Sequence, residues 1–112
     1  MSSEFEAQAS EAVALLKAMA NTPRLLVLCH LAEGGEHSVG DLAAKVGLSQ
    51  SALSQHLARL RELKLVATRK DAQTVFYSVC DDKALQVLSL LHDLFCPELG
   101  RADAIIERRS RS

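Results

Sequence analysis

The chain has 112 residues, 48% hydrophobic and 4% aromatic, which is enough for one small core and too little for a multidomain enzyme. No apolar run approaches the roughly 20 residues that cross a bilayer, and the acidic start, residues 1–6, lacks the hydrophobic stretch of a signal peptide. We therefore expect a protein of the cytosol without membrane contact. Its three widely spaced cysteines are expected to rest as thiols in that reducing compartment.

The net charge of −1 hides an uneven distribution along the chain. Residues 49–70 carry five basic side chains against the single acid Glu62, a local charge of +4. The basic residues of this segment are Arg59, Arg61, Lys64, Arg69 and Lys70. Such a segment suits a polyanionic partner, but it also suits a charged helix face in water, and charge alone leaves both open.

Hydrophobic residues at steps of three and four predict a first helix over residues 4–20. Residues 21–23, Asn-Thr-Pro, end it and begin a second helix over 23–33, because Asn or Thr can cap a helix and Pro suits its first position. Two glycines at 34–35 stop this helix. Since it is apolar nearly all round, we expect it to be central and buried.

A short third helix is predicted over residues 39–46, with Ser38 as its N-cap. It ends at Gly47, and Ser49 caps a fourth helix that continues to about Leu63. A helix, a tight turn that contains glycine and a second helix form the helix-turn-helix layout.

After the fourth helix the hydrophobic period changes from about 3.6 residues to 2. Two β-branched and aromatic runs, residues 65–70 and 74–79, are separated by a polar turn and predict a hairpin in the position of a wing. A last helix is predicted over residues 81–96. The expected fold is mainly α with a β-hairpin wing, a winged helix-turn-helix in the order α-α-α-α-β-β-α. Its domain would span residues 1–97, followed by a polar, Arg-rich and partly disordered tail at 98–112.

The last helix carries more hydrophobic residues than packing within one small domain requires. Its surplus face would meet a second copy of the chain, with the first helix in the same interface, so we expect a homodimer. The alternative is a helix buried deep inside a single domain.

Four segments carry a family resemblance: SQSALSQHLARLR at 49–61, LV at 65–66, RK at 69–70 and FY at 76–77. Together they resemble the recognition helix and wing of the ArsR family of bacterial repressors, and the likeness extends over about residues 10–96. The resemblance implies a dimeric protein that binds a palindromic operator in double-stranded DNA. It also implies release of that DNA when an inducer binds or modifies the protein.

The residues themselves agree with DNA binding. Leucines occupy the inner face of the fourth helix, which leaves short polar side chains exposed on its first turns, where they can reach base edges. These positions are Gln50, Ser51, Ser54 and Gln55. We expect Arg59, Arg69 and Lys70 to contact phosphates. A Ser–His pair in the same helix lacks a third member and an oxyanion loop, so neither catalysis nor a cofactor is expected.

Two residues depart from the family pattern. Lys64 precedes the first wing strand and Ala72 lies at the wing tip, where many family members have glycine. A left-handed backbone at such a residue would cost about 1 kcal/mol.

The positions of Cys29 and Cys96, with the segments at 17–21 and 72–77, resemble the dithiol branch of the family, that of BigR, SqrR and HlyU. In that branch the cysteine pair links the second helix to the last helix within one protomer, as a disulfide or through additional sulfur atoms. The resemblance implies that Cys29 and Cys96 sense reactive sulfur species or an oxidant. Cys80 falls outside the pattern and is expected to be a small buried hydrophobic residue.

Two other hypotheses remain open. His92 and Cys96 are spaced i, i+4, and with Cys29 or His30 they could form a zinc-type metal site, although no fourth ligand is evident. A winged helix could also serve protein–protein contact, but that function would not need the +4 segment.

Overall fold

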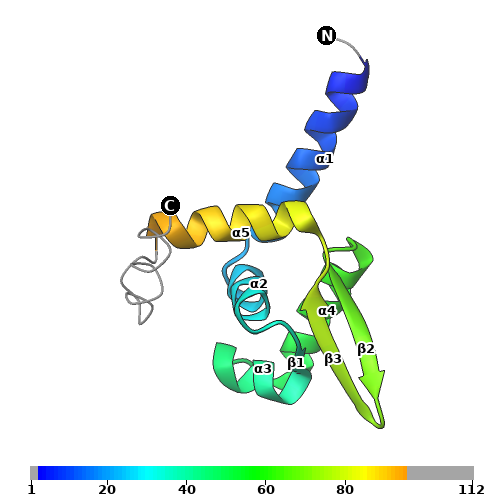
Figure 1. Cartoon of the computed structure of the whole chain (residues 1–112), viewed down its shortest axis with the longest axis vertical. Helices are drawn as coiled ribbons and strands as arrows, with labels where there is room; N and C mark the ends of the chain where they lie inside the picture. The colour runs from blue at the N-terminus through cyan, green and yellow to red at the C-terminus, as the bar shows by residue number, and fades with distance from the viewer. Residues whose placement is uncertain (1–2, 96–112) are drawn as a thin grey trace, which may run out of the picture.

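The computed structural model describes residues 3–95, and it confirms a winged helix-turn-helix that is mainly helical. The elements are α1 Ser3–Met19, α2 Thr22–Gly34, β1 His37–Ser38, α3 Val39–Val46, α4 Gln50–Glu62, β2 Val66–Asp71, β3 Thr74–Val79 and α5 Asp82–Phe95. Figure 1 shows α5 lying across α2, α1 projecting on one side of it, and the α3–α4 pair and the β2–β3 wing on the other. The Arg-rich tail predicted at 98–112 lies outside the described residues.

The sequence did not predict β1. This strand has two residues and pairs antiparallel with β3, His37 with Tyr77 and Ser38 with Phe76, so the sheet has the order β1-β3-β2. Two residues are too few to show an alternating pattern, and it is the partner strand that makes them a strand. The order α-α-α-α-β-β-α is therefore corrected by one short strand before α3.

The helix starts follow the predicted capping residues. Asn21 caps α2, where its Oδ1 accepts a hydrogen bond from the backbone N–H of Arg24 at 3.1 Å. Ser38 and Ser49 cap α3 and α4 in the same way, with distances of 3.2 and 3.1 Å to the backbone nitrogens three residues on. These caps satisfy amide groups that the first helical turn leaves without partners, so they set where each helix begins.

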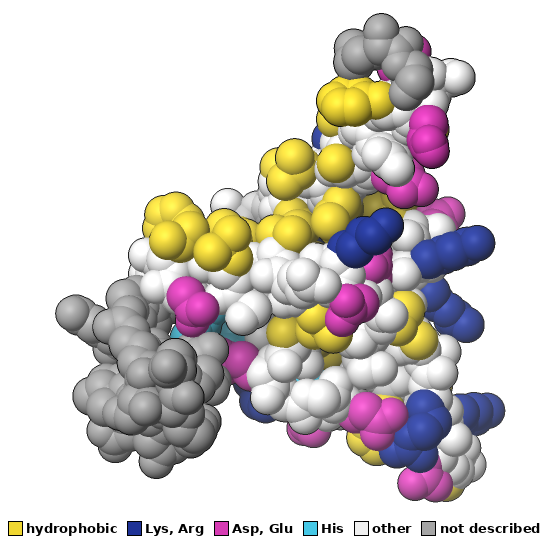
Figure 2. Space-filling model, turned by 45° about the horizontal axis from the view of Figure 1, so that its top comes forward, with side chains coloured by type: hydrophobic (Ala, Val, Ile, Leu, Met, Phe, Trp, Pro, Cys, Tyr) yellow, Lys and Arg dark blue, Asp and Glu magenta, His cyan; other side chains and the backbone are white. Residues whose placement is uncertain are grey.

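The hydrophobic residues of α1 lie almost entirely outside the core. Only Ala18 and Met19, at its C-terminal end, are buried, while Phe5, Val13 and Leu16 are exposed. Hydrophobic side chains form a band along α1 that continues toward the far end of α5 (Figure 2), where Leu90, Leu94 and Phe95 are exposed. Within residues 3–95 no single helix is long and apolar enough to cross a membrane, and the α1–α2 pair that reaches this length and composition is bent by 96°.

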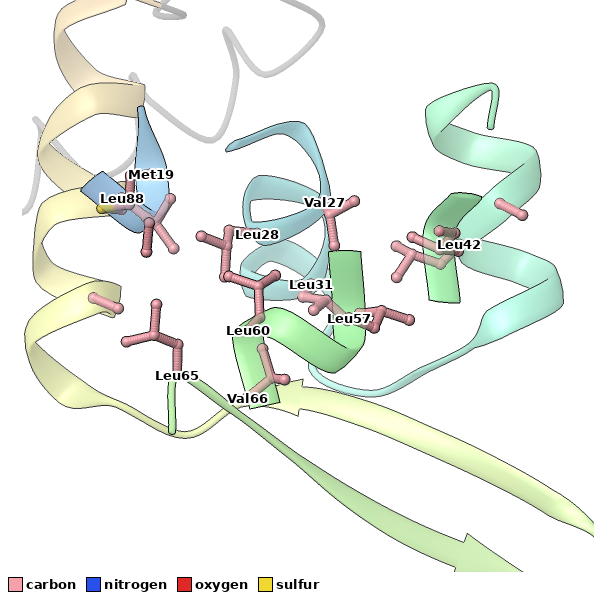
Figure 3. Close-up of a cluster of buried hydrophobic side chains, with 14 residues drawn as sticks. Met19, Val27, Leu28, Leu31, Leu42, Leu57, Leu60, Leu65, Val66 and Leu88 are labelled. Atoms are coloured by element: carbon pink, nitrogen blue, oxygen red, sulfur yellow. The ribbon is translucent and has the colours of Figure 1, made fainter. Parts of the chain in front are cut away.

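The core is centred on α2 and holds the inner face of α4 (Figure 3). The largest fully buried side chains are Val27, Leu28, Leu31, Leu42, Leu53, Leu57 and Leu60. The prediction that α2 is a central, buried helix holds for one face only: Val27, Leu28 and Leu31 are buried, whereas Leu26 is 45% exposed and Leu25, Cys29 and Ala32 are partly exposed. The α4 leucines belong to this shared core, and the contacts of α4 with α3 and β2 fix the orientation of its outer face.

Both departures from the family glycines have left-handed backbones. Lys64 has φ +64° at the entry to the wing, and Ala72 has φ +56° in the two-residue turn between β2 and β3. A side chain in this region costs roughly 1–2 kcal/mol, so the wing retains its shape at a local cost.

Candidate DNA interface and thiol site

The outer face of α4 presents the four polar side chains that the sequence predicted for base contacts. Gln50, Ser51, Ser54 and Gln55 are all exposed, and Leu53, Leu57 and Leu60 hold the opposite face in the core. Ser49 caps the helix end from which these residues project. The arrangement leaves amides and hydroxyls, which can both donate and accept hydrogen bonds, on a rigid exposed surface.

The three predicted phosphate contacts differ in their surroundings. Lys70 is exposed on β2, and Arg59 is exposed and forms an ion pair with Glu62 at 3.4 Å on α4. Arg69, also on β2, is bound by Glu36: its Nε and Nη2 each donate to a carboxylate oxygen at 2.9 Å. Lys and Arg side chains gather on the wing side of the molecule (Figure 2).

Glu36 is a functional candidate that the sequence did not indicate, because it lies 33 residues from Arg69. The hydrogen bonds from Arg69 lower the pKa of the Glu36 carboxyl below its usual value, and the Glu36 carboxylate raises the pKa of Arg69. Arg69 also lies over the ring of Phe76, 5.1 Å from its centroid. The guanidinium is therefore engaged within the protein, whereas the sequence predicted that it contacts phosphate.

Cys29 faces a cleft between α2 and α5. A cavity of about 440 Å³ there is lined by Leu25, Leu26, Cys29, His30, Glu33, Leu91, His92 and Phe95. A neighbouring cavity of about 280 Å³ shares Cys29, Glu33 and His92 with it. Cys96 lies outside the described residues, but Phe95, the residue before it, lines the same cavity as Cys29.

Cys80 is not the buried hydrophobic residue that was expected. It is exposed at the end of the wing, where its Sγ donates to the backbone oxygen of Lys64 at 3.5 Å. The residue lies just after β3 at the core end of the wing, where its backbone N–H donates to the backbone oxygen of the buried Leu65 at 2.9 Å, but its side chain is exposed.

The metal hypothesis finds no support in the described part of the chain. Among residues 3–95 no group of three or more His, Cys, Asp or Glu side chains could hold a metal ion, and Cys96 lies beyond that range. His92 lines the cavity with Cys29, and its Nδ1 lies 4.0 Å from a carboxylate oxygen of Asp93.

A family model described as "Bacterial regulatory protein, arsR family" matches residues 21–68. The transcriptional activator HlyU of Vibrio cholerae is 54% identical over 83% of this chain and 85% of its own length. This chain belongs to the ArsR family. The nodulation protein NolR of Rhizobium meliloti is 49% identical over 94% of this chain and 83% of its own length.

Solved structures agree with this assignment to the ArsR family. Reduced HlyU from Vibrio cholerae matches with a TM-score of 0.79 and 54% identity, over 83% of this chain and 97% of that chain. The transcriptional repressor BigR from Xylella fastidiosa matches with a TM-score of 0.76 and 40% identity, over 86% and 98%. The chain is thus an ArsR-family transcription regulator, and these relatives are regulators and not enzymes.

A buried histidine in this ArsR-family chain also escaped the sequence analysis. His37 on β1 is 7% exposed, and its Nε2 has no hydrogen-bond partner within the described residues. Its Nδ1 lies 3.4 Å from Nζ of Lys45. The ring packs over Gly34, where an added Cβ would overlap it. Burial first, and then the charges of Lys45 and His30, lower the pKa of His37 below its usual 6.5, although Asp41 acts in the opposite direction.

This lowered pKa predicts a loss of stability in acid. Below pH 6.5 the unfolded chain takes up a proton at His37 that the folded chain resists, so the free energy of unfolding falls as the pH falls through this range. We expect His37→Phe to reduce this slope between pH 7.5 and 5.5, by at most the roughly 1.4 kcal/mol per pH unit of a single proton. Urea unfolding of both proteins at each pH measures the difference. Equal slopes for parent and variant would contradict the prediction.

Proposed function

We propose that the protein is a dimeric repressor of the bacterial cytoplasm that binds a palindromic operator and releases it when Cys29 and Cys96 become bridged. Its inducer is a reactive sulfur species or another oxidant. The observation that carries the DNA-binding part is the outer face of α4, where four exposed polar side chains stand on a helix held by the core. Gln can pair with adenine and Ser with several base edges, and Lys70 on the wing is exposed for a phosphate.

The hydrophobic band on α1 and α5 supports the dimer. Phe5, Val13 and Leu16 on α1 and Leu90 and Leu94 on α5 are each about half exposed or more in a single chain. Contiguous apolar surface of this kind marks an interface. A two-fold axis through the band would place two copies of α4 on the same side of the dimer, as two half-sites of a palindrome require.

The position of Cys29 supports the thiol switch. Phe95 lines the same cavity as Cys29 and directly precedes Cys96 in the sequence. A bridge between Cys29 and Cys96 would close over the α2–α5 cleft. It would tie α2, whose buried side chains pack with those of α4, to the helix of the proposed dimer interface. The two α4 helices of the dimer would then change their orientation relative to each other. They would no longer fit two successive major grooves of the operator.

The proposed chemistry needs no reagent beyond the inducer. The thiolate of one cysteine takes the outer sulfur of an organic persulfide, RSSH, and the thiol RSH leaves. The thiolate of the second cysteine then attacks the inner sulfur of the new persulfide, forms the S–S bond and expels hydrogen sulfide. If both cysteines carry an extra sulfur, the same loss of hydrogen sulfide leaves a three-sulfur bridge.

The test of DNA recognition uses α4. We expect Gln50→Ala and Gln55→Ala each to weaken operator binding by about 1–3 kcal/mol and to weaken binding to a scrambled duplex far less. Glu11→Gln, exposed on the face of α1 turned away from the hydrophobic band, is the control and should leave both affinities nearly unchanged. Fluorescence anisotropy with both duplexes at two salt concentrations gives four dissociation constants for each protein. Equal losses on both duplexes would refute the assignment of these residues to base contacts.

A further inference from the structure

The Glu36–Arg69 ion pair joins two residues that lie 33 positions apart in the sequence, across the middle of the wing. Arg69 pairs with Phe76 in the β2–β3 register, and Phe76 pairs in turn with Ser38 on β1. Glu36 immediately precedes β1, so the ion pair reaches across β3 from one edge of the sheet to the other. Both side chains are about half exposed, at 54% for Arg69 and 41% for Glu36.

Glu36 occupies an edge of the Arg69 guanidinium that can bind two phosphate oxygens at once. Nε and Nη2 form a planar fork that fits two oxygens at once, and both nitrogens already donate to Glu36 at 2.9 Å. Nη1 lies 3.9 Å from a carboxylate oxygen of Asp71. Two carboxylates therefore surround the one arginine of the wing, and a DNA phosphate cannot take the fork while Glu36 holds it.

We propose that Glu36 acts as an internal substitute for a DNA phosphate: the wing binds DNA by exchanging the Glu36 carboxylate for a backbone phosphate at Arg69. The inference rests on the proposed function, since it assumes that the wing meets DNA. Glu36 is then a residue that limits sequence-independent affinity. When DNA binds, Arg69 loses its ion pair with Glu36 and gains a contact with a phosphate. Because these two contacts are similar in free energy, Arg69 contributes little to DNA affinity while Glu36 is present.

Removal of the competing charge should therefore strengthen binding. We expect Glu36→Gln to bind a scrambled duplex about threefold to tenfold more tightly than the parent. The slope of log affinity against log salt should steepen by about 0.9, the value for one further neutralised phosphate. A residue that only positioned the wing would weaken binding when changed and would not steepen this slope.

Two further variants separate exchange from simple charge removal. Glu11→Gln removes an equal charge from the exposed pair that Glu11 on α1 forms with Lys83 on α5, a pair that does not involve Arg69, and should change affinity little. In an Arg69→Ala background, Glu36→Gln should lose most of its effect, because no fork remains for the phosphate. Thermal unfolding checks that every variant is folded.

The outcomes are distinct for the two proposals. No binding of any duplex by the parent would reject the proposed function and this inference together. Binding by the parent without a gain for Glu36→Gln beyond that for Glu11→Gln would overturn the exchange alone. A full gain that persists in the Arg69→Ala background would also overturn it, since Glu36 would then act through its charge and not through Arg69.

Discussion

Cys29→Ser and Cys96→Ser are each expected to bind the operator as tightly as the parent and to hold it when an organic persulfide is added. Neither change touches the α4 face, but each removes one of the two sulfur atoms that the bridge needs. The parent should lose at least tenfold in operator affinity under the same treatment, because its two α4 helices can no longer meet successive grooves.

Cys80→Ser is the matched control for this prediction. Cys80 is exposed at the end of the wing and lies outside the proposed pair, so its variant should release DNA like the parent. The measurement is anisotropy of a labelled operator before and after the persulfide, followed by a reducing agent to restore binding. Release by both Cys29→Ser and Cys96→Ser would show that the switch uses other atoms.

Leu16→Glu is expected to convert the dimer into monomers and to reduce operator affinity by about a hundredfold or more. Leu16 is 58% exposed in a single chain, so the change should not disturb the core. It would, however, bury a charge in the proposed dimer interface, which α1 and α5 of the two copies form. A monomer binds only one half-site of the operator. In the dimer, binding of one α4 helix raises the effective concentration of the second α4 helix at the other half-site, and this gain is lost in the monomer.

Ala7→Glu supplies the control on the same helix. Ala7 is exposed and lies about 180° around α1 from Leu16, so the added charge should leave the dimer intact. Sedimentation velocity at micromolar concentration gives the oligomeric state, and anisotropy gives the affinity. A dimeric Leu16→Glu protein with full operator affinity would contradict the proposed interface.

Most of the fold follows from local signals in the sequence. Ser38 and Ser49 cap their helices as predicted, and Asn21, one of two candidates, caps α2, because in each case the side chain and its amide partner are three residues apart. The strands of the wing were also predicted, since each run shows its own alternation. The short strand β1 was missed because only its pairing with β3, about 40 residues further along the chain, defines it.

The site was predictable only where it depends on a single element. The polar face of α4 follows from the helical period, and it is exposed as predicted. The engagement of Arg69 by Glu36 was not predictable, because these residues meet only through the sheet order. The burial of His37 and the exposure of Cys80 likewise depend on how the sheet packs, which no local pattern encodes.

The most direct test of the thiol switch joins chemistry to DNA binding in one sample. The parent protein, bound to its operator without oxygen, is treated with an organic persulfide, digested and measured by mass spectrometry while release is followed by anisotropy. We expect the peptides of Cys29 and Cys96 to be joined within one chain, by two or three sulfur atoms, in proportion to the DNA released. Release without that linkage, or the linkage in protein still bound to the operator, would contradict the proposed mechanism.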